Sequence, residues 1–178
     1  MQFTAEQQRG LLAYARRVLV GIVNDGKKIE EKPADENFLE KAGVFVSLHK
    51  DKELRGCIGF IEPIASIWEA ITENTISSAT NDFRFPPVTS DELDDLKIEI
   101  SILTPPIQCQ REEIEPNKNG VIIQSGIHKA TYLPQVWEVL PEPEQFYSSL
   151  CQKAGLEQNC WRGKSIKFLK YEAIVFHE

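Results

Sequence analysis

The order of the predicted elements constrains this chain most: a β-hairpin, a helix and a strand follow one another twice, at 43–103 and at 120–176. The clearest strand, Lys97–Ile102, alternates polar and apolar residues without a break. In the second half, a helix over 143–154 keeps apolar residues on one face and stops at Gly155. A hairpin cannot bury its apolar face alone and needs a helix against it. We therefore expect an α+β fold of two related hairpin-helix-strand units, of the β-α-β-β type, sharing a core.

An N-terminal helix precedes the first of these units. The residues from Thr4 to Gln7 fit a capping box, and apolar residues keep helical spacing as far as about Val23. A chain of 178 residues can bury roughly 70% of its unfolded surface, which is sufficient for a core without disulfides or metal. We expect one domain over 1–178, with sub-units at about 43–103 and 120–176.

Composition narrows the class of protein. A content of 42% hydrophobic and 26% charged residues is typical of globular chains. The net charge of −7 argues against a protein that binds the phosphate backbone, so nucleic acid is not an expected partner. No apolar run reaches the roughly 20 residues of a membrane span, and the first residues lack the pattern of a signal peptide. We expect a soluble, cytoplasmic protein with no membrane partner.

The cysteines and histidines give no sign of a metal or disulfide framework. The four cysteines include no CxxC pair, and the three histidines lie far apart. Reduced thiols are therefore expected, with Cys151 in a structural role, and no metal site is predicted. Motifs typical of nucleotide binding or serine hydrolysis are absent as well, so no cofactor is predicted.

Residues 54–59, Leu-Arg-Gly-Cys-Ile-Gly, form the strongest local motif. Gly56 and Gly59 in one strand indicate a bulge or the close approach of a ligand or backbone. Matching the apolar faces of the hairpin predicts a three-residue loop, with Ser47 opposite Arg55. Arg55 and Cys57 would then share a face about 7 Å apart, where the guanidinium favours a thiolate. The alternative is that Cys57 is a small buried residue needed for packing.

In that register His49 lies about 13 Å along the strand from Cys57 and cannot serve as its general base. A cysteine–histidine pair would have to recruit His128 or His177 from elsewhere in the chain.

A second motif, 82–87, places an arginine between aromatic residues in a loop stiffened by two prolines. Arg84 could present its guanidinium to a carboxylate or a phosphate. Alternatively, Asp82 pairs with Arg84 while Phe85 fills the core. We expect this loop to return toward the cysteine motif, so that Arg55, Cys57 and Arg84 line one cleft.

Two further polar residues are candidates for ligand contacts. Glu99 lies on the polar face of the alternating strand, which is either the solvent side or a wall of the site. Gln135 ends the second hairpin and offers an amide.

These motifs together resemble the AMMECR domain family, whose prokaryotic members are called AmmeMemoRadiSam system protein A. The resemblance rests on 54–59, on 82–88 (Asp-Phe-Arg-Phe-Pro-Pro-Val), on Ile98–Leu103, on 133–136 and on 153–156, in order along nearly the whole chain. Two positions depart from the family pattern: Phe83 stands where proline is usual, and Asn119-Gly120 stands where His-Gly is usual.

The resemblance implies an α+β fold with two related β-α-β-β units and an N-terminal helix. It implies a functional site at the cysteine motif and a pathway shared with Memo-like and radical SAM proteins, but no settled activity. The residues favour a binding or accessory module whose cleft surrounds the motif and grips a small molecule or a protein partner. The alternative is a cysteine-dependent enzyme in which Cys57 attacks a small anionic substrate held by Arg55 and Arg84. Whether the chain is an enzyme is left open, because no second proton-transfer residue can be placed beside Cys57.

Overall fold

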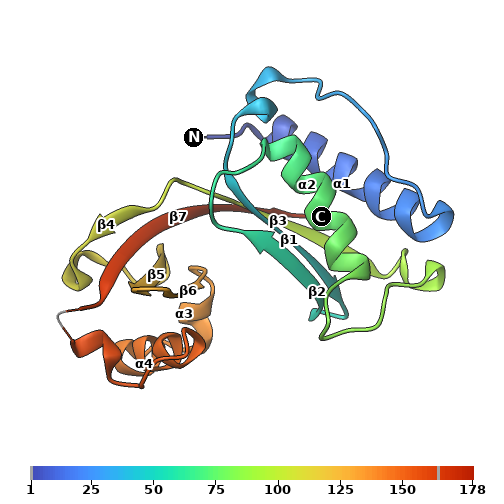
Figure 1. Cartoon of the computed structure of the whole chain (residues 1–178). Coiled ribbons are helices and arrows are strands. Elements are labelled where there is room, and N and C mark those ends of the chain that lie inside the picture. Colours follow the sequence, from blue (N-terminus) through green and yellow to red (C-terminus); the bar gives the residue numbers. More distant parts are fainter. Residues whose placement is uncertain (1, 164) are drawn as a thin grey trace. The chain divides into compact units, whose positions relative to one another are not determined.

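The computed structural model describes residues 2–163 and 165–178, and these form two compact units. One unit comprises the chain up to Leu103 together with Ile174–Glu178, and the other comprises Thr104–Ala173. We call them the Cys57 unit and the disulfide unit. Their element order is that of the two predicted repeats, so the α+β class, the paired hairpin-helix-strand units and the N-terminal helix are confirmed (Figure 1).

The Cys57 unit packs two helices against one face of an antiparallel sheet (Figure 1). The strand order is β2-β1-β3, followed by the end of β7. In chain order its elements are α1 (Ala5–Asp25), η1 (Glu36–Leu39), β1 (Gly43–Lys50), β2 (Glu53–Phe60), α2 (Ile67–Thr80), η2 (Ser90–Glu92) and β3 (Leu96–Leu103).

Both helices of this unit begin as their sequences dictate. Thr4 and Ser66 are the N-caps of α1 and α2, and each forms a capping box with the residue three positions later. α1 ends at Gly26, whose φ of 63° is the left-handed conformation that glycine adopts without strain. Alternate residues of β1, namely Val44, Val46 and Leu48, are fully buried in the core beneath the helices. The residues between them therefore face away from the helices.

The disulfide unit repeats this order with different lengths. Its strands follow the order β7-β5-β6, with β4 paired to β7. Its elements are β4 (Ile107–Cys109), η3 (Arg111–Glu113), β5 (Asn119–Ser125), β6 (His128–Tyr132), α3 (Val136–Val139), α4 (Pro143–Lys153), η4 (Cys160–Arg162) and β7 (Lys167–His177).

The buried hydrophobic residues of each unit form a cluster. In the disulfide unit the cluster is built on stacked aromatic rings. The rings of Trp137 and Phe146 lie 3.6 Å apart and nearly parallel, and Tyr147 meets both edge-on. Burial raises the pKa of Tyr147 to about 12.

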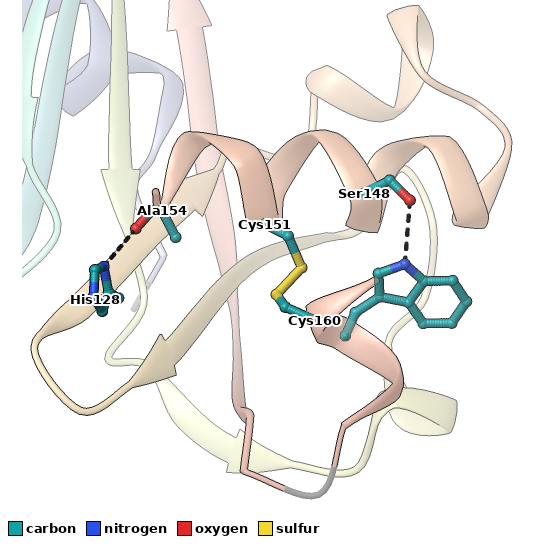
Figure 2. Close-up of a disulfide and its surroundings, with 6 residues drawn as sticks. His128, Ser148, Cys151, Ala154 and Cys160 are labelled. Carbon is teal, nitrogen blue, oxygen red and sulfur yellow. Dashed lines mark hydrogen bonds between the residues drawn. A yellow bond between two sulfur atoms is a disulfide. The ribbon is translucent and has the colours of Figure 1, made fainter. Parts of the chain in front are cut away.

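The expectation of reduced thiols is wrong for two of the four cysteines. Cys151 on α4 and Cys160 in η4 form a disulfide, with a Cα–Cα distance of 6.0 Å (Figure 2). The chain reverses after α4 through Gly155, whose φ of 73° is left-handed, and this reversal returns Cys160 to the helix. The pair has no CxxC spacing and is set by the path of the chain, so the spacing of cysteines could not reveal it.

Among residues 2–163 and 165–178, no helix combines the length and the apolar character that a membrane crossing requires. Within the same residues, no group of three or more His, Cys, Asp or Glu side chains is placed to hold a metal ion.

Candidate functional site around Cys57

The hairpin that carries Cys57 has a register different from the predicted one. Its turn consists of two residues, Asp51 and Lys52, both with positive φ, and not of three. A register shift then falls between Leu48 and His49, and it leaves Arg55 as an extra residue on β2. Ser47 consequently lies opposite Cys57, where Arg55 was expected.

This bulge separates Arg55 from Cys57. Gly56 faces α2, because a Cβ there would lie 2.3 Å from the carbonyl oxygen of Ser78. Arg55 turns toward the segment after α2: its guanidinium donates to Glu92 at 3.0 and 2.9 Å and to the carbonyl of Pro86 at 2.9 Å. The prediction that Arg55 and Cys57 share a face is therefore wrong, since an inserted residue reverses the alternation of side chains.

Cys57 lies on the face of the sheet that carries no helix. Ser47 donates a hydrogen bond to its Sγ at 3.3 Å. On the other side of Ser47, β3 places Glu99 directly opposite, so a row of Cys57, Ser47 and Glu99 crosses three strands. Gly59 lies on the same face, where a Cβ would come within 2.3 Å of the Phe45 ring. Gly56 and Gly59 thus both make room for other parts of the protein.

The thiol of Cys57 is held in its neutral form. Burial raises its pKa above the ordinary value, and the nearby carboxylates of Asp82 and Glu99 add to this, whereas Ser47 and Arg84 act in the opposite direction. The expected depression of the pKa is therefore wrong in sign. The physical reason is that the guanidinium of Arg55 is turned away and neutralised by Glu92, while the half-buried thiol is desolvated.

The 82–87 loop returns to the cysteine motif as expected. Arg84 donates to the carbonyl oxygen of Cys57 at 3.1 Å, and the Asp82 carboxylate accepts a hydrogen bond from the Cys57 N–H at 2.8 Å. Asp82 also binds Arg84 at 2.6 Å, so the ion pair considered from the sequence is present. Among residues 2–163 and 165–178, no strand pairs with the outer edge of β2, and the loop covers that edge at Cys57.

Phe85 lies between the two arginines of the motifs and does not fill the core. Its ring is half-buried, with the guanidinium carbons of Arg55 and Arg84 at 6.0 and 5.4 Å from its centre. Phe83, by contrast, is 94% exposed.

The carboxylates of this region are strongly acidic. Hydrogen bonds from Arg84 and from the Cys57 N–H hold the pKa of Asp82 far below its usual range, although its side chain is almost fully buried. Hydrogen bonds from Arg55 lower the pKa of Glu92 from 4.5 to about 2. Both groups are therefore ionised at neutral pH and act as fixed anions.

His49 lies closer to Cys57 than the sequence suggested. Because Cys57 pairs with Ser47, His49 is two residues away along β1, about 7 Å, and not four rungs. Its Nε2 lies 3.9 Å from a carboxylate oxygen of Glu99. The predicted register places His49 too far from Cys57 to act as its general base, and the bulge that changes this register has no signal in the residue pattern.

The remaining candidates lie in the disulfide unit. Gln135 precedes α3, and its Oε1 is buried without a hydrogen-bond partner among the described residues. His128 Nδ1 donates a hydrogen bond to the carbonyl oxygen of Ala154, at 3.0 Å, which ties β6 to the end of α4 (Figure 2).

Comparison with known proteins decides the family. A model of the AMMECR1 family matches residues 12–176. The chain belongs to the AMMECR1 family. Among its relatives, protein MK0488 of Methanopyrus kandleri is 41% identical over 99% of this chain and 91% of its own length. Protein MJ0810 of Methanocaldococcus jannaschii is 42% identical over 98% of this chain and 92% of its own.

A solved structure shares the fold. The crystal structure of the uncharacterized protein PH0010 from Pyrococcus horikoshii matches with a TM-score of 0.93 and 36% sequence identity, covering 100% of this chain and 94% of that one. The names of these relatives state no activity. We therefore infer function from the site of this AMMECR1-family chain.

Proposed function

We propose that this AMMECR1-family protein is a binding module that docks a protein partner through the 82–87 loop and performs no chemistry at Cys57. The observation that carries the proposal is that both arginines of the two motifs are already bound within the protein. Arg84 is bound by Asp82 and by the Cys57 carbonyl, and Arg55 is bound by Glu92 and Pro86. Each guanidinium is paired with a carboxylate, so neither offers an unpaired positive charge to an anionic substrate.

These internal bonds give the loop the rigidity that a docking surface needs. A segment that is ordered before binding loses less conformational entropy when its partner arrives. Two prolines and the hydrogen bond from the Val88 N–H to the Ala79 carbonyl, at 2.8 Å, fix the end of the loop. On this support Phe83 is 94% exposed, and exposed aromatic residues on rigid supports are frequent anchors of protein interfaces.

The partner is expected to bind side chains of the loop and not to add a strand to β2. Strand addition needs free backbone N–H groups along a sheet edge. The N–H groups of Cys57 and Ile58 are bound instead by Asp82 and by the hydroxyl of Ser78, each at 2.8 Å.

The identity of the partner is proposed from the family. Because the chain resembles AmmeMemoRadiSam system protein A, we propose Memo-like and radical SAM proteins as the first candidates. Proline is usual in the family at the position where this chain has Phe83. We therefore infer that Phe83 determines which partner this chain selects.

The test measures binding of the purified full-length protein to the Memo-like protein and to the radical SAM protein of the same organism. Phe83→Ser should weaken binding to one of them by at least about tenfold. A matched control is Ile127→Ser, because Ile127 is 96% exposed in the β5–β6 turn of the other unit. Binding to neither protein, or an equal loss in both variants, contradicts the proposal.

A second candidate, a cysteine-dependent enzyme, is favoured only by the row in which Ser47 hydrogen-bonds Cys57 next to Glu99. Such an enzyme needs a thiolate near neutral pH. The raised pKa of Cys57 opposes this, which is why we place docking first.

A further inference from the structure

A cavity of about 470 Å³ lies within the Cys57 unit, at the turn end of β1 and β3. Its walls include His49, the turn residues Asp51 and Lys52, Lys97, Glu99 and His177. His49 and Lys97 lie opposite each other on the face that carries no helix, one step along the strands from Ser47 and Glu99. The volume is within the range of about 300–1,000 Å³ that small-molecule sites occupy.

The cavity contains charged and polar groups that the protein does not pair. Within the described part of the chain, the side chains of Lys52, Lys97 and His177 form no hydrogen bond or ion pair. This is the opposite of Arg55 and Arg84, which are each bound by a carboxylate.

The cavity also contains an unsatisfied polar atom. The Nε2 of His49 is buried without a hydrogen-bond partner among the described residues, and the nearest carboxylate, that of Glu99, is 3.9 Å away. Buried polar atoms in native proteins are usually hydrogen-bonded, so an unpaired one beside a half-buried carboxylate marks a place where a polar partner is missing. A ligand amine next to Glu99 supplies a counter-charge to that carboxylate.

The signs of the charges determine the class of ligand. Lys97 and Lys52 offer positive charge, with His177 as a further polar group, while Glu99 and Asp51 offer negative charge. Glu178 also lines the cavity, but its carboxylate is paired with Arg16. A simple anion would leave Glu99 unpaired in a partly desolvated site, and a simple amine would leave Lys97 unpaired. A molecule with one charge of each sign satisfies both.

We propose that this cavity binds a small zwitterion of the amino-acid type, with its carboxylate on Lys97 and its ammonium group on Glu99. Lys52 and His177 also line the cavity. The site does not involve Phe83 or the thiol of Cys57, so it stands or falls independently of the docking proposed above.

The test titrates the isotope-labelled full-length protein with glycine, 4-aminobutyrate and 6-aminohexanoate, and with butyrate and butylamine as single-charge probes. We expect saturable binding of at least one amino acid, with the largest NMR shifts at His49, Lys97 and Glu99. Its dissociation constant should be at least about tenfold lower than that of either single-charge probe. Absence of saturable binding, or equal binding of butyrate or butylamine, overturns the proposal.

Two variants assign the ends of the ligand. Lys97→Met and Glu99→Gln should each raise the dissociation constant of the bound amino acid by at least about tenfold. Lys167→Met and Glu53→Gln, which change exposed residues outside the cavity, should leave it unchanged. Thermal melts of all four variants show that they are folded. If folded Lys97→Met and Glu99→Gln proteins bind like wild type, the assigned residues do not form the site.

Discussion

The two units have the same order of elements, but different kinds of bond hold the segment that follows the helix in each unit. In the Cys57 unit, the loop after α2 returns to the edge of β2 and is held there by ion pairs of Asp82 and Glu92. In the disulfide unit, the segment after α4 returns to the helix itself and is held by the Cys151–Cys160 bond (Figure 2). Beside that bond, the Trp161 indole N–H donates to the hydroxyl of Ser148 at 3.2 Å.

The pattern of apolar residues therefore determines the order of the elements in both units. Separate local bonds determine where the segments after α2 and α4 lie. Ion pairs hold this segment in the Cys57 unit, so acid should lower the stability of that unit. A covalent bond holds the corresponding segment in the disulfide unit, so a reductant should lower the stability of that unit.

The largest effect is expected for Asp82→Ala. The carboxylate is nearly buried and binds both Arg84 and the Cys57 N–H, so its loss leaves an unpaired N–H at the covered edge of β2. We expect the free energy of unfolding to fall by about 3–5 kcal/mol. Hydrogen exchange should quicken in β2 before it quickens in β6.

The control for that experiment is Asp94→Ala, because Asp94 is exposed and forms no bond within the described part of the chain. An equal loss in both variants, or protection unchanged in β2, would show that the ion pair does not hold the edge.

The next effect is expected on opening the disulfide. The two cysteines are separated by 9 positions. Closing a loop of that size stabilises a protein by roughly 3 kcal/mol in the chain-entropy model. Cys160→Ala should lower the free energy of unfolding by that amount and speed exchange in the segment after α4. Cys109→Ala is the matched control, since Cys109 is a free cysteine of the same unit.

Acid should act on the Cys57 unit through Glu92. Its pKa is lowered from 4.5 to about 2 in the folded protein, so its contribution to stability is present above pH 4.5 and is lost as the pH falls toward 2. The linkage relation gives a loss of about 2 kcal/mol between pH 7 and pH 3. Glu92→Gln lacks this term, so unfolding curves of the two proteins should differ less at pH 3 than at pH 7. A difference that does not change with pH would mean that the pair with Arg55 does not carry the effect.

The sequence predicted the elements of both units because apolar spacing, caps and glycine stops are local signals. The Thr4 cap, the break at Gly26 and the strand around Ile98–Leu103 all follow from residues within one turn or strand. The return of Arg84 to the cysteine motif was also predicted.

The predictions that were wrong concern contacts that depend on single residues with effects far along the chain. The extra residue at Arg55 does not alter the pattern of apolar residues in the sequence. It nevertheless moves Arg55 away from Cys57 and brings His49 closer to Cys57. The Cys151–Cys160 bond likewise depends on the path of the chain between the two cysteines. The candidate site was therefore predicted in its segments but not in its contacts.

The smallest effect on stability is expected at Cys57 itself, and it separates docking from catalysis. The Ser47 hydroxyl already donates to Sγ, and it can bond a serine hydroxyl at the same position equally well. Cys57→Ser should therefore change the free energy of unfolding by less than about 1 kcal/mol. Each unit holds one free cysteine, Cys57 and Cys109, and burial raises the pKa of both. Two carboxylates, those of Asp82 and Glu99, further disfavour the thiolate of Cys57.

The corresponding measurement is alkylation by iodoacetamide, which consumes the thiolate. In the folded protein at pH 8, Cys57 should react more slowly than Cys109, and the two should react alike after denaturation. Alkylation of Cys57 that is faster than that of Cys109 at pH 7 would mean that the site ionises its thiol despite burial. The catalytic alternative would then displace docking, because only a stabilised thiolate gives the row of Cys57, Ser47 and Glu99 a nucleophile.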